Sequence, residues 1–204
     1  MSVRFDLALL SADERYKLLG GLIVPRPIAL VTSQSADGRI NAAPFSFFNV
    51  FAEEPPLIVL GLGLSPQGGA KDTTVNIRDT GEFVVNLVDE AIALAMNLCA
   101  IDFPPEVNEI EVAGLDLAPS EKVAPPRIVQ APVSLECRRY VTLQAARGRY
   151  LIIGEVVMAH VQNGVVDPAT LRVDREVYAP IGRLFGGGYV RTHDRFEMPR
   201  LTYR

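Results

Sequence analysis

The residues best suited to bind a ligand lie at the end of a glycine-rich loop, in the segment Gly68–Thr74. Its two glycines leave the backbone able to turn N–H groups inward, and a helix start adds further N–H donors and a positive dipole end. Lys71 adds a full charge, and Thr73 or Thr74 adds a hydroxyl. Such loops are more often plain architecture, but this set of groups indicates a site for a phosphate or another anion.

The same segment approaches two nucleotide-binding motifs without completing either. Gly61–Gly63 follows an apolar run, but Pro66 stands near the place where the helix of a dinucleotide-binding unit should start. A P-loop requires glycine before its lysine and Ser or Thr after it, whereas Lys71 lies between Ala70 and Asp72. Neither motif therefore predicts the ligand.

Side chains for nucleophilic or metal-assisted catalysis are sparse. His160 and His193 are the only histidines, and neither has other metal-ligating residues at a suitable spacing. Cys99 and Cys137 share no local motif, so we expect two free core thiols and a reducing, cytoplasmic location. If the chain is an enzyme, a cofactor is expected to supply its chemistry.

Short strands and turns must position these residues, because the strands and helices do not alternate regularly. Ser11 and Glu14 form a capping box, and Gly20 with Gly21 predicts the end of the first helix. Pro44 indicates an edge strand or a bulge rather than a central strand position. The predicted strands cover residues 28–33, 39–49, 57–62, 82–88, 128–143 and 149–161. The predicted helices cover residues 11–19, 72–79 and 90–100, with Asp72 or Thr73 capping the second and Gly81 ending it.

The length allows one large domain or two small ones. We expect one domain over residues 1–204, with an N-terminal arm and helix to about residue 22 and a C-terminal tail from about residue 190. A net charge of −4 without a basic cluster argues against nucleic acid as the main partner. The apolar runs are too short to span a membrane. We expect a mostly β fold with attached helices, namely an antiparallel barrel, with residues 103–126 as a looped insertion.

Several segments together resemble the flavin reductase-like, FMN-binding split-barrel family, which includes flavoredoxin. They are VPRPIALVTS, the Ala-Asp-Gly turn, INAAPFSFFNVF, PPLIVLGLG, KDT, GEFVVNLV and RFEMPR. The resemblance runs in order from about Ile23 to Arg200 and is weakest across residues 103–126. It implies a split β-barrel of antiparallel Greek-key type, forming a homodimer with one FMN per subunit near the interface.

The resemblance also assigns residues to the cofactor. Thr32 and Ser33 would lie by the flavin or its phosphate tail, and Asn49 would reach the ribityl chain or phosphate. Arg26 would add a second positive charge, and Tyr189 would cover the ring, from either subunit. The residues beside the isoalloxazine would be Ala43, Pro44, Phe45 and Ser46, and those at the phosphate would be Lys71, Asp72 and Thr73.

The function implied is an oxidoreductase that passes hydride from NADH or NADPH to N5 of FMN, with no side-chain acid or base required. A monooxygenase or another redox protein is the implied partner. The alternative is a flavoredoxin-like electron carrier with tightly bound FMN and a protein redox partner. A flavin-binding module without turnover is a third class, and an oxidase of pyridoxamine phosphate is disfavoured because the matching segments belong to the reductase branch.

Overall fold

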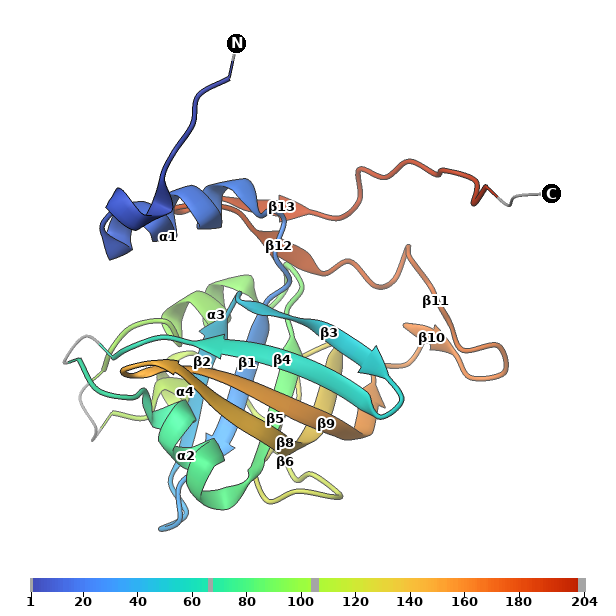
Figure 1. The fold of residues 1–204 in the computed structure, drawn as a ribbon. Coiled ribbons are helices and arrows are strands. Elements are labelled where there is room, and N and C mark those ends of the chain that lie inside the picture. Colours follow the sequence, from blue (N-terminus) through green and yellow to red (C-terminus); the bar gives the residue numbers. More distant parts are fainter. Residues whose placement is uncertain (1, 66–67, 104–106, 202–204) are drawn as a thin grey trace.

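A seven-stranded antiparallel sheet forms the body of the protein, in a computed structural model that describes residues 2–65, 68–103 and 107–201. The strand order is β2-β1-β5-β8-β9-β4-β3, so that β2 and β3, adjacent in sequence, form the two edges. Figure 1 shows the sheet curled on itself, which brings these edges together at the split of the barrel. The strands are β1 (Ala29–Gln34), β2 (Ile40–Phe45), β3 (Phe48–Glu53), β4 (Pro56–Leu62), β5 (Glu82–Leu87), β8 (Val133–Ala146) and β9 (Arg149–Val161).

Smaller elements surround this sheet. A 3-10 turn η1 (Leu7–Leu9) precedes α1 (Ala12–Leu22), and the other helices are α2 (Asp72–Thr80), α3 (Ala93–Leu98) and α4 (Glu109–Val112). Three two-stranded pairs complete the fold: β6 (Leu117–Ala118) with β7 (Arg127–Ile128), β10 (Val166–Asp167) with β11 (Arg172–Val173), and β12 (Ile181–Arg183) with β13 (Tyr189–Arg191). No helix in the described part of the chain has both the length and the apolar character needed to cross a membrane.

Both faces of β1 are buried, which explains why its first half reads as a continuous apolar run. Ala29 and Val31 point into the barrel, whereas Leu30 points outward beneath the helices. The interior core contains Phe45, Ile58, Leu60, Leu62, Ile77, Phe83, Val85, Cys137 and Ile152. The outer core contains Ile28, Ala42, Val88, Ile92, Met96, Cys99, Ile110, Leu115, Ile128, Ala131 and Ile181.

Two local predictions require correction. The predicted strand 39–49 is two strands, because the chain leaves β2 after Phe45 and starts β3 at Phe48 on the opposite edge of the barrel. The first helix has the predicted capping box, but it continues through the glycine pair to Leu22. Gly20 is its only buried residue and lies against Phe185, so packing compensates for the low helix propensity of glycine there. Pro44 lies in an edge strand, as predicted.

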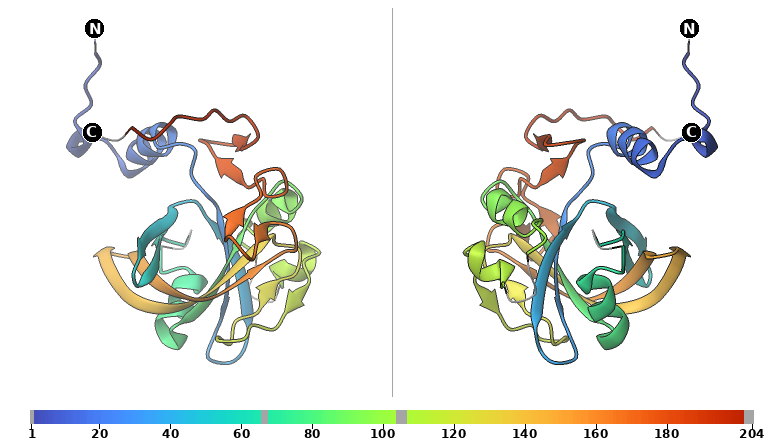
Figure 2. Two further views of the ribbon diagram at one scale, coloured as in Figure 1. Left: turned by 90° about the vertical axis from the view of Figure 1, so that its right-hand side faces the viewer. Right: turned by 90° about the vertical axis from the view of Figure 1, so that its left-hand side faces the viewer.

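The N-terminal helix lies outside the barrel. Figure 2 shows α1 with the β12–β13 pair and the C-terminal tail in a layer beyond one end of the sheet. The buried Arg26 side chain joins this layer to the body, donating to the carbonyls of Ile23 (2.9 Å) and Leu184 (3.0 Å) and to Ser46 Oγ (3.3 Å). The outer faces of α1 have few partners within the described chain, which leaves Leu22 70% exposed.

The insertion packs on the outer face of the sheet, where it encloses a charged residue. Glu136 of β8 is fully buried, and its carboxylate accepts hydrogen bonds from the backbone N–H groups of Glu121 (2.7 Å) and Lys122 (2.6 Å). His160 Nε2 lies 2.5 Å from the same carboxylate. Burial would raise the pKa of Glu136, but these hydrogen bonds together hold it below its ordinary value of 4.5.

We expect Glu136→Gln to lower the free energy of unfolding by about 2 kcal/mol at pH 7, because hydrogen bonds to a buried charged acceptor are lost. Since the folded-state pKa is the lower one, the stabilisation is present above the ordinary pKa and disappears as the pH falls through the folded value. Urea unfolding between pH 3 and 7 should therefore show that the free energies of unfolding of the wild type and of Glu136→Gln become more alike as the pH falls. A difference in free energy of unfolding that stays the same on acidification would contradict this account.

Candidate functional site

The N-terminus of α2 presents unpaired donors of the kind that bind anions. Lys71 is the N-cap residue and makes no side-chain cap hydrogen bond, so the first N–H groups of the helix keep no capping partner from that side chain. Thr74, in the first turn, is 1% exposed, and its Oγ1 is buried without a hydrogen-bond partner in the described part of the chain. A lysine, uncapped helix N–H groups and an orphaned hydroxyl thus belong to one helix end.

The glycine loop contributes less than the sequence suggested. The N–H of Gly68 donates to the Ser65 carbonyl (2.9 Å) and that of Gly69 donates to Ser65 Oγ (3.2 Å), so both turn into the loop itself. Gly68 does have a positive φ of 87°. The prediction that these glycines direct N–H groups at an anion is therefore wrong, because the tight turn uses their donors internally. The helix supplies the donors instead.

Two side chains from outside the helix complete this region. Asn41 of β2 contacts Thr73 Oγ1 at 3.0 Å, and Glu109 Oε1 of α4 accepts from the N–H of Ala42 at 2.7 Å. In the flipped orientation of the Asn41 amide, its nitrogen donates to Glu109 Oε1 (3.2 Å), and its oxygen accepts from Thr73 Oγ1 (3.0 Å) and from the N–H of Ala42 (3.3 Å). Glu109 lies in the insertion, and no local sequence signal pointed to it. The insertion therefore reaches the edge strand β2 beside the helix N-terminus.

Arg149 is a further cation that sequence reasoning missed. It follows the β8–β9 turn, where a Cβ at Gly148 would collide with Leu64 and approach the Gly69 carbonyl, so the turn packs closely on the glycine loop. The Arg149 guanidinium lies near Gly63, with Nη1 3.6 Å from the position of a Cβ there. The hairpin thus brings a second positive charge to the loop that precedes α2.

Thr32 and Ser33 lie near this region but are fully buried on opposite faces of β1. Thr32 Oγ1 donates to the Pro126 carbonyl (2.5 Å), beneath the insertion. Ser33 Oγ accepts from Asn76 Nδ2 of α2 (3.1 Å). Both hydroxyls hold elements together, and Ser33 is the one that faces α2.

The remaining predicted residues follow the split of the barrel. Along β2, Phe45 packs in the interior core and Ala43 packs against it, whereas Pro44 points to the other face. Ser46 is half-buried and accepts from Arg26, and Asn49 is exposed on β3 with its Oδ1 accepting from the next N–H. The structure thus brings Thr73 and the β2 edge together and places Asn49 on the facing edge strand.

Two predicted residues are engaged elsewhere. Arg26 makes the bonds to Ile23, Leu184 and Ser46 described above and one more to the Gly20 carbonyl of α1, and these occupy most of its donors. Tyr189 of β13 contacts Arg183 through its hydroxyl, and the Arg183 guanidinium lies 4.6 Å from the Tyr189 ring centroid. Both residues therefore belong to the layer that contains α1.

The described residues contain no cluster of three or more His, Cys, Asp or Glu that could hold a metal ion. Cys99 and Cys137 are buried and free, as predicted. Burial and the charge of Glu109 raise the pKa of Cys99 to about 11, and burial raises the pKa of Cys137 further. A thiol with so high a pKa carries little thiolate at neutral pH, so neither is suited to act as a nucleophile.

Comparison with known proteins identifies relatives over the whole fold. The profile of the flavin reductase like domain matches residues 21–182. The 2-nitrobenzoate 2-nitroreductase NbaA of Pseudomonas fluorescens has a similar structure, with 39% identity, a TM-score of 0.90 and coverage of 99% of this chain and 98% of that one. Nitrilotriacetate monooxygenase component B of Bacillus cereus gives 35% identity, a TM-score of 0.90 and coverage of 97% and 99%. A split barrel domain from Shewanella frigidimarina, 20% identical with a TM-score of 0.79 and full coverage of both chains, shows the fold.

Proposed function

This chain belongs to the flavin reductase like domain family, with the split-barrel fold, and from that premise we propose that it is an NAD(P)H-dependent flavin reductase that binds FMN. The observation that carries the proposal is the N-terminus of α2, where Lys71 and the orphaned Thr74 hydroxyl accompany uncapped N–H groups. This donor set fits a phosphate monoester, which needs several donors and positive charge.

The residues around this point have complementary tasks in the proposal. Lys71, Thr73 and the first-turn N–H groups of α2 hold the phosphate, and Arg149 adds charge from the hairpin. Asn41 fixes the Thr73 hydroxyl from β2. Beyond Ala42, whose N–H donates to Glu109, the outer edge of β2 has no neighbouring strand, so backbone C=O groups there can accept from the polar edge of a flat ring. Bound there, FMN would supply the redox chemistry by accepting hydride from a reduced nicotinamide.

A homodimer is part of the proposal because large apolar side chains are left uncovered beside the split. Val50 and Phe51 of β3 are 72% and 65% exposed, and Phe47 is 48% exposed. The Tyr16 ring of α1 lies 6.1 Å from that of Phe47, so the exposed helix and the exposed edge strand adjoin. A second copy of the chain would bury both surfaces next to the flavin.

We expect Val50→Asp with Phe51→Asp to convert the protein to a monomer, because two charges would be buried without partners in the interface. Sedimentation velocity gives the mass directly. Leu171→Asp is the matched control, since Leu171 is 78% exposed on the separate β10–β11 turn. A wild-type protein that is already monomeric, or a double variant that stays dimeric, would contradict the proposed interface.

Anaerobic addition of NADH or NADPH to the FMN-loaded protein tests the function. Loss of the visible absorbance of the oxidised flavin, at a rate well above that of unbound FMN, is the expected result. Ultrafiltration afterwards separates two roles. Reduced flavin that passes the filter supports a reductase feeding a monooxygenase, the role suggested by the Bacillus cereus relative, which is a monooxygenase component. Retained flavin that exchanges electrons only with a redox protein would favour the flavoredoxin-like carrier. A protein that binds no FMN would contradict both.

A further inference from the structure

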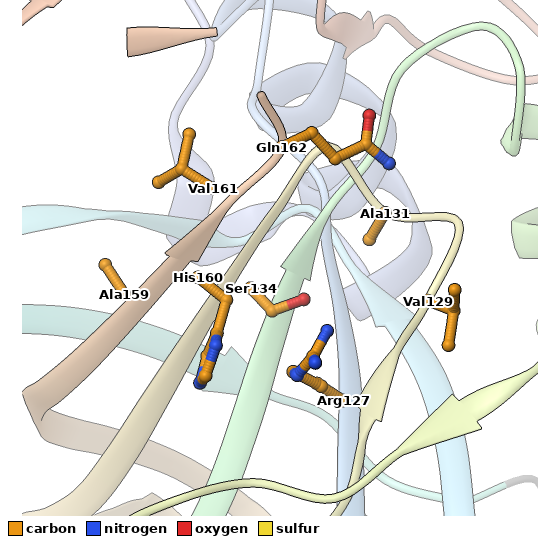
Figure 3. A pocket seen from close by; sticks show the side chains of 8 residues that line it. All are labelled: Arg127, Val129, Ala131, Ser134, Ala159, His160, Val161 and Gln162. Atoms are coloured by element: carbon orange, nitrogen blue, oxygen red, sulfur yellow. The ribbon is translucent and has the colours of Figure 1, made fainter. Parts of the chain in front are cut away.

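A pocket lies on the outer face of the barrel, between β7 and the β8–β9 pair (Figure 3). Its cavity is ≈ 390 Å³, within the range of about 300–1,000 Å³ common for ligand sites. It is found where β8 begins and β9 ends, whereas the opposite end of this hairpin touches the glycine loop before α2. About twelve strand residues at roughly 3.3 Å each separate the two places along the hairpin. The lining residues are Arg127, Val129, Ala131, Ser134, Ala159, His160, Val161 and Gln162.

Arg127 is the residue that indicates a ligand. Its Nε is buried from solvent yet has no hydrogen-bond partner in the described part of the chain, and no ion pair there includes its guanidinium. A buried donor without an acceptor is costly, and the cost is greater for a charged group. Figure 3 shows this side chain directed into the pocket, toward the region of Ser134 and His160. Because Nε is closed to solvent in this rotamer, an acceptor that enters the pocket would satisfy it once the guanidinium rotates to present its Nε edge to the cavity.

The other lining groups define what that acceptor is. Ser134 Oγ donates to Asn86 Oδ1 (2.8 Å) and His160 Nε2 lies against Glu136, so both side chains already have partners and neither hydrogen-bonds to Arg127. Glu136 itself does not line the cavity, and its oxygens accept from two backbone N–H groups and face His160. Arg127 is the only permanently charged residue that lines the pocket. Its single positive charge can therefore balance one negative charge on a ligand. The apolar side chains on this face are the aliphatic Val129 and Ala131, whereas Ala159 and Val161 alternate with His160 on β9 and border the pocket with their backbone.

We propose that this Arg127 pocket binds a small monocarboxylate with a short aliphatic body. A carboxylate accepts two parallel N–H bonds from one edge of a guanidinium, and the edge that contains Nε is the one left unsatisfied here. Val129 and Ala131 then cover the body of the ligand. The site is separate from the proposed flavin site and does not depend on it.

The Nε–H resonance of Arg127 reports binding directly in the full-length, nitrogen-15-labelled protein, assigned by its loss in Arg127→Gln. Butyrate should shift this resonance in a saturable way, whereas butanamide, its neutral counterpart, should not. Succinate should bind more weakly than butyrate, because its second charge has no partner. The titrations are performed with and without saturating FMN, and the affinity for butyrate should be the same in both.

Variants test whether the arginine holds the ligand. By calorimetry, Arg127→Gln should weaken butyrate binding at least tenfold, and Arg127→Lys should weaken it less because charge is kept without the paired geometry. Arg39→Gln, on an exposed turn, should bind as the wild type does. The Tm of Arg127→Gln should not fall, since an unsatisfied group is removed. The proposal is overturned by an unshifted resonance at tens of millimolar butyrate, by an equal response to butanamide or inorganic phosphate, or by unchanged affinity in Arg127→Gln.

Discussion

Lys71→Ala combined with Thr73→Ala should weaken FMN binding on the order of 100-fold or more, with the fold retained. Each hydrogen bond to a charged phosphate contributes roughly 1.5–3 kcal/mol, and about 1.4 kcal/mol corresponds to a factor of ten in affinity. Lys71 has no capping role to lose, because its side chain makes no cap hydrogen bond. Quenching of flavin fluorescence during titration gives both dissociation constants.

Riboflavin makes this prediction specific to the phosphate. It has the same ring and ribityl chain without the phosphate, so its affinity should be nearly equal in wild type and double variant. Arg78→Ala, at the exposed C-terminal end of the same helix, should leave FMN affinity unchanged. Because Thr73 is buried and bonded to Asn41, Lys71→Ala alone is measured as well. Equal FMN affinity in the double variant and the wild type would remove the phosphate assignment.

Phe83→Ala should give the largest loss of stability, about 3–5 kcal/mol in the free energy of unfolding. Phe83 of β5 is 0% exposed in the interior core, and its ring lies against Gly154 of β9, where a Cβ would approach Cε1 to 2.9 Å. The cavity left by the ring is bounded by strands and is therefore poorly able to collapse. Urea unfolding at a fixed protein concentration measures the change.

Leu94→Ala is the control for that measurement, because Leu94 is 75% exposed on α3 and its loss should cost less than about 0.5 kcal/mol. Phe83→Leu should fall between the two, since most of the volume is kept. A cost for Phe83→Ala as small as that of Leu94→Ala would mean that the interior of the barrel is not packed as described.

Local patterns in the sequence determined the individual strands and helix ends. The apolar runs of β1, β4 and β5 were recognisable because burial on both faces requires nearly every position to be apolar. Gly81 ends α2 with a φ of 76°, as expected for a residue with no Cβ. The capping box of α1 is equally local. The membership of the chain in its family could likewise be predicted from short segments read in order.

Only the tertiary structure decided which residues meet. The sequence at Ser46 and Phe47 gives no strong signal that one strand ends and another begins. The chain breaks there because β2 and β3 join opposite edges of the barrel. Glu109 reaches Ala42 across 67 positions of sequence, and Arg127 becomes an orphaned cation only when β7 packs against the β8–β9 pair. The Gly68 and Gly69 donors were misassigned for a different reason, because the local turn geometry directs both of them to Ser65. Propensity acts over a few neighbouring residues, whereas hydrogen-bond partners and burial depend on segments far apart in the chain that folding brings together.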